Sequence, residues 1–278
     1  MSSKVVRVFS VIVVIILVLI GTGYYFLFSS GVSSAQLYVE YGEVFVNGEV
    51  VVSVVELAEG DVVLTGNDGL ATIILYGSIV VNLKEGTEVS LDDLTKEHPQ
   101  ISQEGGETWN TFTKLSGVQA YSLKNGDAIA SVRGTSFGIK DGYILGGEGE
   151  VSYVVAGQIF EVVGKGVVEV VDGEPVEREA TAGEVEEIRN NLENALSELQ
   201  SLRDEVLEDN AFLVGLIQDQ TGLGEGELRV YMRQIDDGDI DLDELMAQAP
   251  VKTEAVKRIE EITRAILEIK SKIASLDE

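Results

Sequence analysis

Residues 130–139 read ASVRGTSFGI, a strand-like apolar pattern that contains one arginine and two glycines. The pattern favours a β-strand, a tight turn at Gly134 and a second strand with Phe137 in the core. Gly134 and Gly138 indicate backbone positions that need glycine. We expect Arg133 to lay its stem along the core and to clamp nearby carbonyl or carboxylate groups with its guanidinium. An anion or ligand contact is the alternative role for this arginine.

Short runs rich in valine and isoleucine surround this stretch, and tight-turn sequences separate them. These turns are Asn47-Gly48, Asn67-Asp68-Gly69, Asn125-Gly126, Asp141-Gly142 and Asp172-Gly173. Their residues tolerate the positive φ of tight turns. One strand and turn every 8–12 residues or so is typical of an all-β fold. Residues 37–180 therefore predict an all-β domain: a short-strand sandwich, a barrel or a β-solenoid.

The polar composition between Asp92 and Gly106 predicts a surface loop within this domain. His98, the only histidine of the chain, lies there, and we expect it to be solvated.

Several motifs within residues 37–160 follow one another in a familiar order. They are Gly42-Glu43-Val44, Glu59-Gly60-Asp61, Thr65-Gly66, Gly69-Leu70-Ala71, Leu75-Tyr76-Gly77-Ser78, Leu83, Gly86-Thr87-Glu88-Val89, Trp109, Lys114-Leu115 and the run from Ala130 to Gly138. In this order the segment resembles a FecR domain, an extracytoplasmic module named after an iron-citrate transport regulator. The resemblance implies a structural role in this domain for six residues: Arg133, Gly134, Thr135, Phe137, Gly138 and Trp109.

The N-terminal segment differs from that of signalling proteins of this type, which carry a cytoplasmic segment that engages a sigma factor. Here only residues 1–7 precede a long apolar stretch, and they are too few for a folded domain. We therefore expect no signal to pass by that route.

Residues 8–28, VFSVIVVIILVLIGTGYYFLF, carry no charge and match the thickness of a bilayer as a helix. Lys4 and Arg7 precede them, and the next basic residue is Lys84, which predicts a cytoplasmic N-terminus. We expect a single-pass membrane anchor, a linker at 29–36 and an extracytoplasmic bulk. A signal peptide cleaved near Ala35 is the alternative, although its apolar core would be unusually long.

The pattern changes at Thr181, where Thr181 and Glu184 form a capping-box sequence. Two heptad seams follow, at Val185, Ile188, Leu192, Ala195, Leu199, Leu202 and Val206, and at Ala255, Ile259, Ile262, Ile266, Ile269, Ile273 and Leu276. Their matched lengths predict an antiparallel coiled-coil hairpin of residues 181–208 and 252–276. Pairing between subunits of a homo-oligomer is the alternative.

The insert at 209–251 predicts three short helices at the hairpin tip, and it is rich in acidic residues. Its sequence DDGDIDLDE, residues 236–244, fits only the second half of an EF-hand loop. Arg233 would replace the first carboxylate ligand. We therefore expect no metal site. If calcium does bind, the candidate ligands are Asp237, Asp241 and Glu244.

The net charge of −28 disfavours nucleic acid as a partner, because the surface repels phosphate. Without cysteine the chain has no disulfides and no thiolate chemistry. No catalytic motif and no cofactor motif is found in the sequence. We expect a protein that is not an enzyme and binds no cofactor.

These patterns leave three hypotheses for the function. The first is a membrane-tethered cell-surface binding or scaffold protein that presents the β-domain and the hairpin to a protein partner or an envelope component. The second is a structural subunit of a surface filament or oligomeric assembly. The third is an extracytoplasmic sensor that acts through a separate membrane partner.

Overall fold

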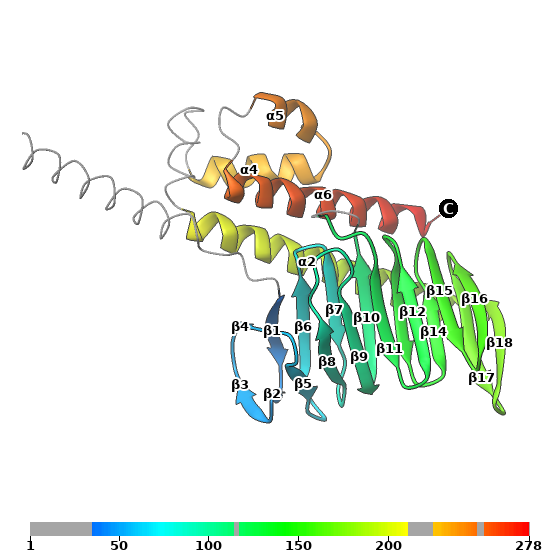
Figure 1. Cartoon of the computed structure of the whole chain (residues 1–278). Helices are drawn as coiled ribbons and strands as arrows, with labels where there is room; N and C mark the ends of the chain where they lie inside the picture. Colours follow the sequence, from blue (N-terminus) through cyan, green and yellow to red (C-terminus); the bar gives the residue numbers. More distant parts are fainter. Residues whose placement is uncertain (1–34, 114–116, 211–224, 249–252, 278) are drawn as a thin grey trace, which may run out of the picture. The chain divides into compact units, whose positions relative to one another are not determined.

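The computed structural model describes residues 35–113, 117–210, 225–248 and 253–277 (Figure 1). The predicted tail (1–7), the predicted span (8–28) and nearly all of the linker (29–36) lie outside these residues. Within the described ranges, no helix is both long enough and apolar enough to cross a bilayer. Anchoring through residues 8–28 therefore stays a prediction.

Two nine-stranded sheets make up most of the described chain. Sheet A runs in the order β18 (Glu174–Glu179), β17 (Gly166–Val171), β14 (Tyr143–Gly146), β13 (Ser136–Lys140), β10 (Glu107–Phe112), β7 (Ile79–Leu83), β6 (Leu70–Leu75), β1 (Ala35–Tyr41) and β4 (Val55–Glu56). Sheet B runs in the order β16 (Gln158–Val163), β15 (Glu150–Val155), β12 (Ala128–Val132), β11 (Tyr121–Asn125), β9 (Gln100–Gly105), β8 (Glu88–Asp93), β5 (Val62–Thr65), β2 (Val44–Val46) and β3 (Glu49–Val51).

The chain builds both sheets in one direction, because short groups of strands alternate between them. Strands β6 and β7 belong to sheet A, β8 and β9 to sheet B, and the alternation continues to β18. The strand pairs are antiparallel except β9 and β11, which pair in parallel. This stepwise growth explains why the sequence fits a sandwich and a solenoid equally well. The result is a sandwich of two sheets.

The core between the sheets is a single cluster with residues from both. The ring of Tyr121 in sheet B lies 6.5 Å from that of Phe112 and 6.4 Å from that of Phe137, both in sheet A. All three side chains are completely buried. Aromatic contacts at this separation join the two sheets at the centre of the sandwich.

The surface loop predicted between Asp92 and Gly106 is wrong for most of its length, since β9 occupies residues 100–105. Polar composition was misleading because the inward side chain of Gln103 is fully buried and hydrogen bonded. Its amide donates to the carbonyl oxygen of Gly106 at 2.9 Å and accepts from Thr108 Oγ1 at 2.8 Å. His98 is exposed, as expected, and its Nε2 lies 2.8 Å from Ser122 Oγ.

Two long helices follow the sheets, α2 (Ala182–Asp209) and α6 (Glu254–Ser275). The capping box at the start of α2 is confirmed, because Thr181 and Glu184 each accept a backbone N–H of the other. The helices are antiparallel, as two contacts show: Arg189 with Asp277 at 2.5 Å, and Arg203 with Thr263 at 3.3 Å.

The predicted seams do not form a two-helix coiled coil that projects from the sheets. Ile188, Leu199 and Ile266 belong to one buried cluster that also contains Trp109 and Val167 of sheet A. The two helices therefore form a layer on sheet A, and residues 34–278 group as one compact unit. Heptad spacing places apolar residues on one side of a helix, but the partner of that side can be a sheet as well as a helix.

The insert contains α4 (Glu225–Asp236) and α5 (Leu242–Gln248). Ile235, Leu242 and Met246 form a small separate core that packs against Val256 and Leu267 of α6. The first of the three helices predicted for the insert lies outside the described residues.

Candidate functional site

The structure places Arg133 in the turn between β12 and β13, where its side chain is exposed. Neither a hydrogen bond nor an ion pair of Arg133 is found within the described part of the chain. The expected clamp is wrong for a simple geometric reason: Val132, the last residue of β12, points into the core, so the next side chain points away from it. Gly134 forms the turn with φ of +80°, a conformation that favours glycine.

Thr135 and Phe137, which follow the turn, are both buried. Thr135 is buried and its Oγ1 donates to the carbonyl oxygen of Glu150 at 3.0 Å, which ties β13 to the start of β15. Phe137 lies in the core between the sheets.

Gly138 faces Trp109 across the β13–β10 pair in register, on the outer side of sheet A. A Cβ atom at Gly138 would lie 2.7 Å and 2.8 Å from two ring carbons of Trp109. The missing side chain therefore makes room for the indole ring. Trp109 is 1% exposed, in the cluster beneath the helices, so it is not a platform for a ligand.

Polar contacts spread along α2 hold this helix across sheet A. Glu184 at its start receives Arg178 of β18 at 2.8 Å, and Glu205 near its end accepts a hydrogen bond from Tyr38 of β1 at 2.8 Å. The Arg178 guanidinium holds the pKa of Glu184 well below its usual range. Burial and the contact with Glu205 raise the pKa of the Tyr38 hydroxyl. Helix α2 thus spans sheet A from one edge strand to β1.

Helix α6 is attached to the turns at one end of the sandwich. Arg258 donates to the carbonyl oxygen of Tyr76 at 2.6 Å, and Lys165 donates to that of Leu276 at 3.0 Å. A Cβ atom at Gly77 would lie 2.7 Å from the Arg258 guanidinium, so glycine is required for this approach. With both helices in place, the outer side of sheet A is largely buried within the protein.

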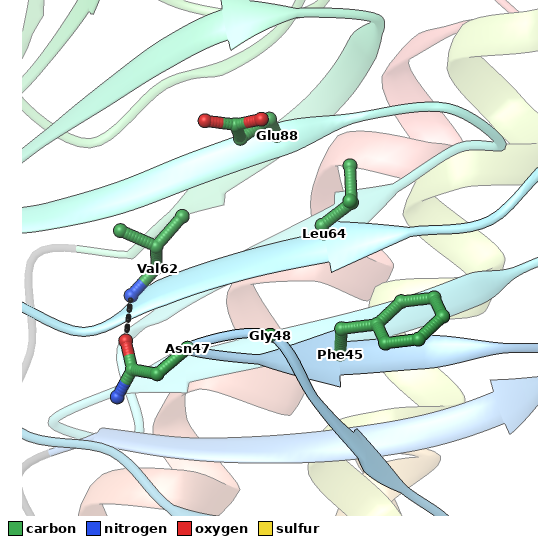
Figure 2. Close-up of a pocket in the computed structure, with 6 residues that line it drawn as sticks. All are labelled: Phe45, Asn47, Gly48, Val62, Leu64 and Glu88. Carbon is green, nitrogen blue, oxygen red and sulfur yellow. Dashed lines mark hydrogen bonds between the residues drawn. The ribbon is translucent and has the colours of Figure 1, made fainter.

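The outer face of sheet B has a hollow at the β2–β5–β8 end (Figure 2). The hollow has a volume of about 420 Å³ and is lined by Phe45, Asn47, Gly48, Val62, Leu64 and Glu88. Figure 2 shows Phe45, Leu64 and Glu88 on three neighbouring strands, which agrees with their cross-strand register. The lining is mainly apolar and includes one carboxylate, that of Glu88.

A buried ion pair joins the helices, and sequence reasoning missed it. Arg203 of α2 and Asp236 of α4 are 3% and 4% exposed and form two hydrogen bonds, of 2.6 and 2.7 Å. Gln200 also donates to this carboxylate, and Thr263 of α6 contacts the guanidinium. Arg203 directly follows Leu202 of the heptad seam, and this position was the only hint in the sequence that Arg203 is buried. The pair fixes the insert to the long helices and is not accessible to a ligand.

The acidic residues of the insert do not converge. Asp237 pairs with Lys270 at 2.7 Å, and Asp241 accepts the N–H groups of Asp243 and Glu244 at the start of α5. Over the described ranges, no group of three or more acidic or histidine side chains is placed to hold a metal ion. The expectations of no metal and no cofactor stay predictions that calcium titration would test.

Comparison with known proteins identifies the β-domain. Residues 61–174 match the family described as FecR protein, so the chain contains a FecR domain, as its motifs predicted. The proteins of this family are regulatory and are not enzymes. No curated protein sequence matches the chain.

Two crystal structures from Parabacteroides distasonis, each of a protein proposed to be an anti-sigma factor, are similar to this chain at 18% sequence identity. Each has a TM-score of 0.39, and the match covers 44% of this chain and 60% of that one. The chain therefore spans less than two thirds of the length of these structures.

Proposed function

We propose that the protein is a non-enzymatic regulatory module that is tethered to the membrane and binds a separate partner protein outside the cytoplasm. The observation that carries this proposal is the contrast between the two sheets. The protein's own helices cover sheet A, whereas sheet B exposes an apolar hollow at one end and Ile129 and Ile159 at the other. Partner binding through sheet B uses the surface that the fold leaves open.

The FecR domain supports a role in sensing more than one in scaffolding, since the family is regulatory. The uncharged stretch 8–28 would tether the domain, with Lys4 and Arg7 on the cytoplasmic side. The signal would then cross the membrane through the partner.

Site-specific photocrosslinking of the full chain in its own membranes tests the proposal. A photoreactive residue at Leu64 or at Ile129 probes sheet B, and one at the exposed Glu193 of α2 is the control. We expect a discrete protein adduct from at least one sheet B position and none from Glu193. No adduct from sheet B, or the same adduct from all three positions, would refute it.

Gene deletion separates regulation from scaffolding. Deleting the gene for this protein and deleting the gene for the crosslinked partner should change the same set of transcripts. Loss of envelope integrity with unchanged transcripts would instead identify a scaffold.

A further inference from the structure

The hollow on sheet B lies beside an open sheet edge. Phe45 of β2 pairs in register with Leu64 of β5 on one side and with Val50 of β3 on the other. The row Leu64–Phe45–Val50 therefore runs across the outer face and ends at β3, the outermost strand. Val50 is 59% exposed, and Val52, just beyond the strand, is 85% exposed. An apolar row thus reaches the edge of the sheet without a cover.

The backbone of β3 is also available at this edge. Asn47 and Gly48 have φ of 53° and 82° and form a two-residue hairpin turn between β2 and β3. In such a hairpin the residues that flank the turn exchange hydrogen bonds and the next pair does not. The N–H and C=O groups of Val50 therefore face outward, where another strand can meet them.

The edge strand β18 of sheet A shows what a protected edge looks like in this protein. It carries Pro175 and the charged residues Glu174, Glu177, Arg178 and Glu179. Proline and charge on an edge strand prevent pairing with another chain. Strand β3 has no proline, and its one charged residue, Glu49, lies next to the turn, whereas its central residue is valine. The edge at β18 is therefore blocked against pairing with another strand, whereas the edge at β3 is open to it.

The charge around β3 has one sign. Residues 35–83 contain no lysine, arginine or histidine, and their acidic residues are Glu40, Glu43, Glu49, Glu56, Glu59, Asp61 and Asp68. Glu88 adds a further carboxylate at the rim of the hollow. A second copy of this chain would bring the same negative charge to the contact, which disfavours self-association here. A basic partner is favoured by the same field.

We propose that β3 accepts an extended segment of a partner protein as an additional strand of sheet B, and that this segment alternates apolar with basic residues. The apolar side chains of this segment extend the row Leu64–Phe45–Val50, and its backbone forms hydrogen bonds with Val50. Its lysine or arginine side chains are attracted to the surrounding carboxylates. Strand addition of this kind takes affinity from main-chain hydrogen bonds and specificity from alternate side chains. The inference rests on the proposed function and names the chemistry of the partner's contact segment.

The probe for this proposal is a labelled nine-residue peptide with valine at odd and lysine at even positions. The control peptide has glutamate in place of lysine. Fluorescence anisotropy with the full chain in detergent micelles gives the Kd of each at physiological salt. We expect binding of the lysine peptide and at least tenfold weaker binding of the glutamate peptide. Equal affinities would overturn the charge argument, and no binding of the lysine peptide would overturn the proposal.

Two matched variants locate the site. Val50→Pro removes the outward N–H of β3, and Ile159→Pro makes the same change at a 69% exposed residue of β16, the opposite edge of sheet B. We expect Val50→Pro to weaken the peptide at least tenfold and Ile159→Pro to leave its Kd within twofold. Unchanged binding by Val50→Pro, or equal losses in both variants, would refute β3 as the site.

Two further measurements keep the test decisive. If Val50→Pro does not fold, as judged by its melting midpoint, Leu64→Glu takes its place, because Leu64 is 38% exposed and its substitution leaves the backbone intact. Light scattering of the micelle-bound chain checks for a dimer that Leu64→Glu abolishes, which would overturn the proposal in favour of a second copy. A crosslinked partner in membranes together with no peptide binding would sustain the proposed function and reject strand addition.

Discussion

Replacing Gly138 with alanine tests the packing that joins the FecR domain to the helices. The added Cβ would lie 2.7 Å from one ring carbon of Trp109, whereas ordinary van der Waals contact begins near 3.4 Å. The ring must therefore move by roughly 0.7 Å within the buried cluster that it shares with residues of α2 and α6. Overpacking of a core by one methyl group costs about 1–3 kcal/mol. We expect a loss of that size in the free energy of unfolding.

Gly105→Ala is the matched control, because Gly105 ends β9 and no atom lies within 4 Å of the position that a Cβ would take there. This variant should be neutral or slightly stabilised, since alanine restricts the unfolded chain. Denaturant titration followed by fluorescence is sufficient for both, as Trp109 is the only tryptophan. The tryptophan signal of Gly138→Ala should also shift in the folded state.

A double-mutant cycle with Trp109→Leu, followed by circular dichroism, isolates the contact. Leucine leaves space for the new methyl group, so Gly138→Ala should cost much less in that background, with a coupling of about 1 kcal/mol or more. Equal denaturation midpoints for Gly138→Ala and Gly105→Ala, or additive effects in the cycle, would refute the packing argument.

Three other substitutions have defined outcomes. Arg133→Met should change the free energy of unfolding by less than about 0.5 kcal/mol, since Arg133 is exposed, and a large loss in denaturant titration would support the clamp instead. Asp236→Ala should cost about 3–5 kcal/mol because it leaves Arg203 buried without its partner, and a loss below 1 kcal/mol in denaturant would contradict this reasoning. Burial and nearby Glu40 raise the pKa of Glu198 to about 6, so folding favours the protonated form of this carboxyl. The stability that this shift contributes is present below pH 4.5 and is lost as the pH rises through 6. Glu198→Gln should therefore stabilise the protein above pH 6 and have little effect at pH 4, as melting curves across that range would show.

Local chemistry explains which features could be predicted from the sequence. The turn at Asn47-Gly48 and the cap at Thr181 each depend on a few adjacent residues, and both are found where expected. The FecR motifs also depend on short spacings. These signals do not require knowledge of what packs against what.

Features that depend on distant partners could not be predicted in the same way. The position of Arg133 relative to the core follows from the strand ending at Val132, and one residue of difference turns a side chain from the inside to the outside. The buried amide of Gln103 in the polar strand β9 also donates to the carbonyl oxygen of Ile139 at 3.4 Å, 36 positions along the chain. The pairing of Arg203 with Asp236 joins residues 33 positions apart.

The burial of Trp109 bears most directly on function. The sequence suggested that the helices project away and present a partner surface, but their apolar sides meet Trp109, Leu145 and Val167 of sheet A. A partner that used those sides would first have to displace the helices and expose a continuous apolar face, which is costly in water. The C-terminal helices therefore stabilise the β-domain, and recognition falls to the surfaces they leave open. At the hollowed end of sheet B, the apolar row Leu64–Phe45–Val50 lies among carboxylates. The apolar row therefore determines where a partner binds, and the negative charge beside it excludes acidic partners.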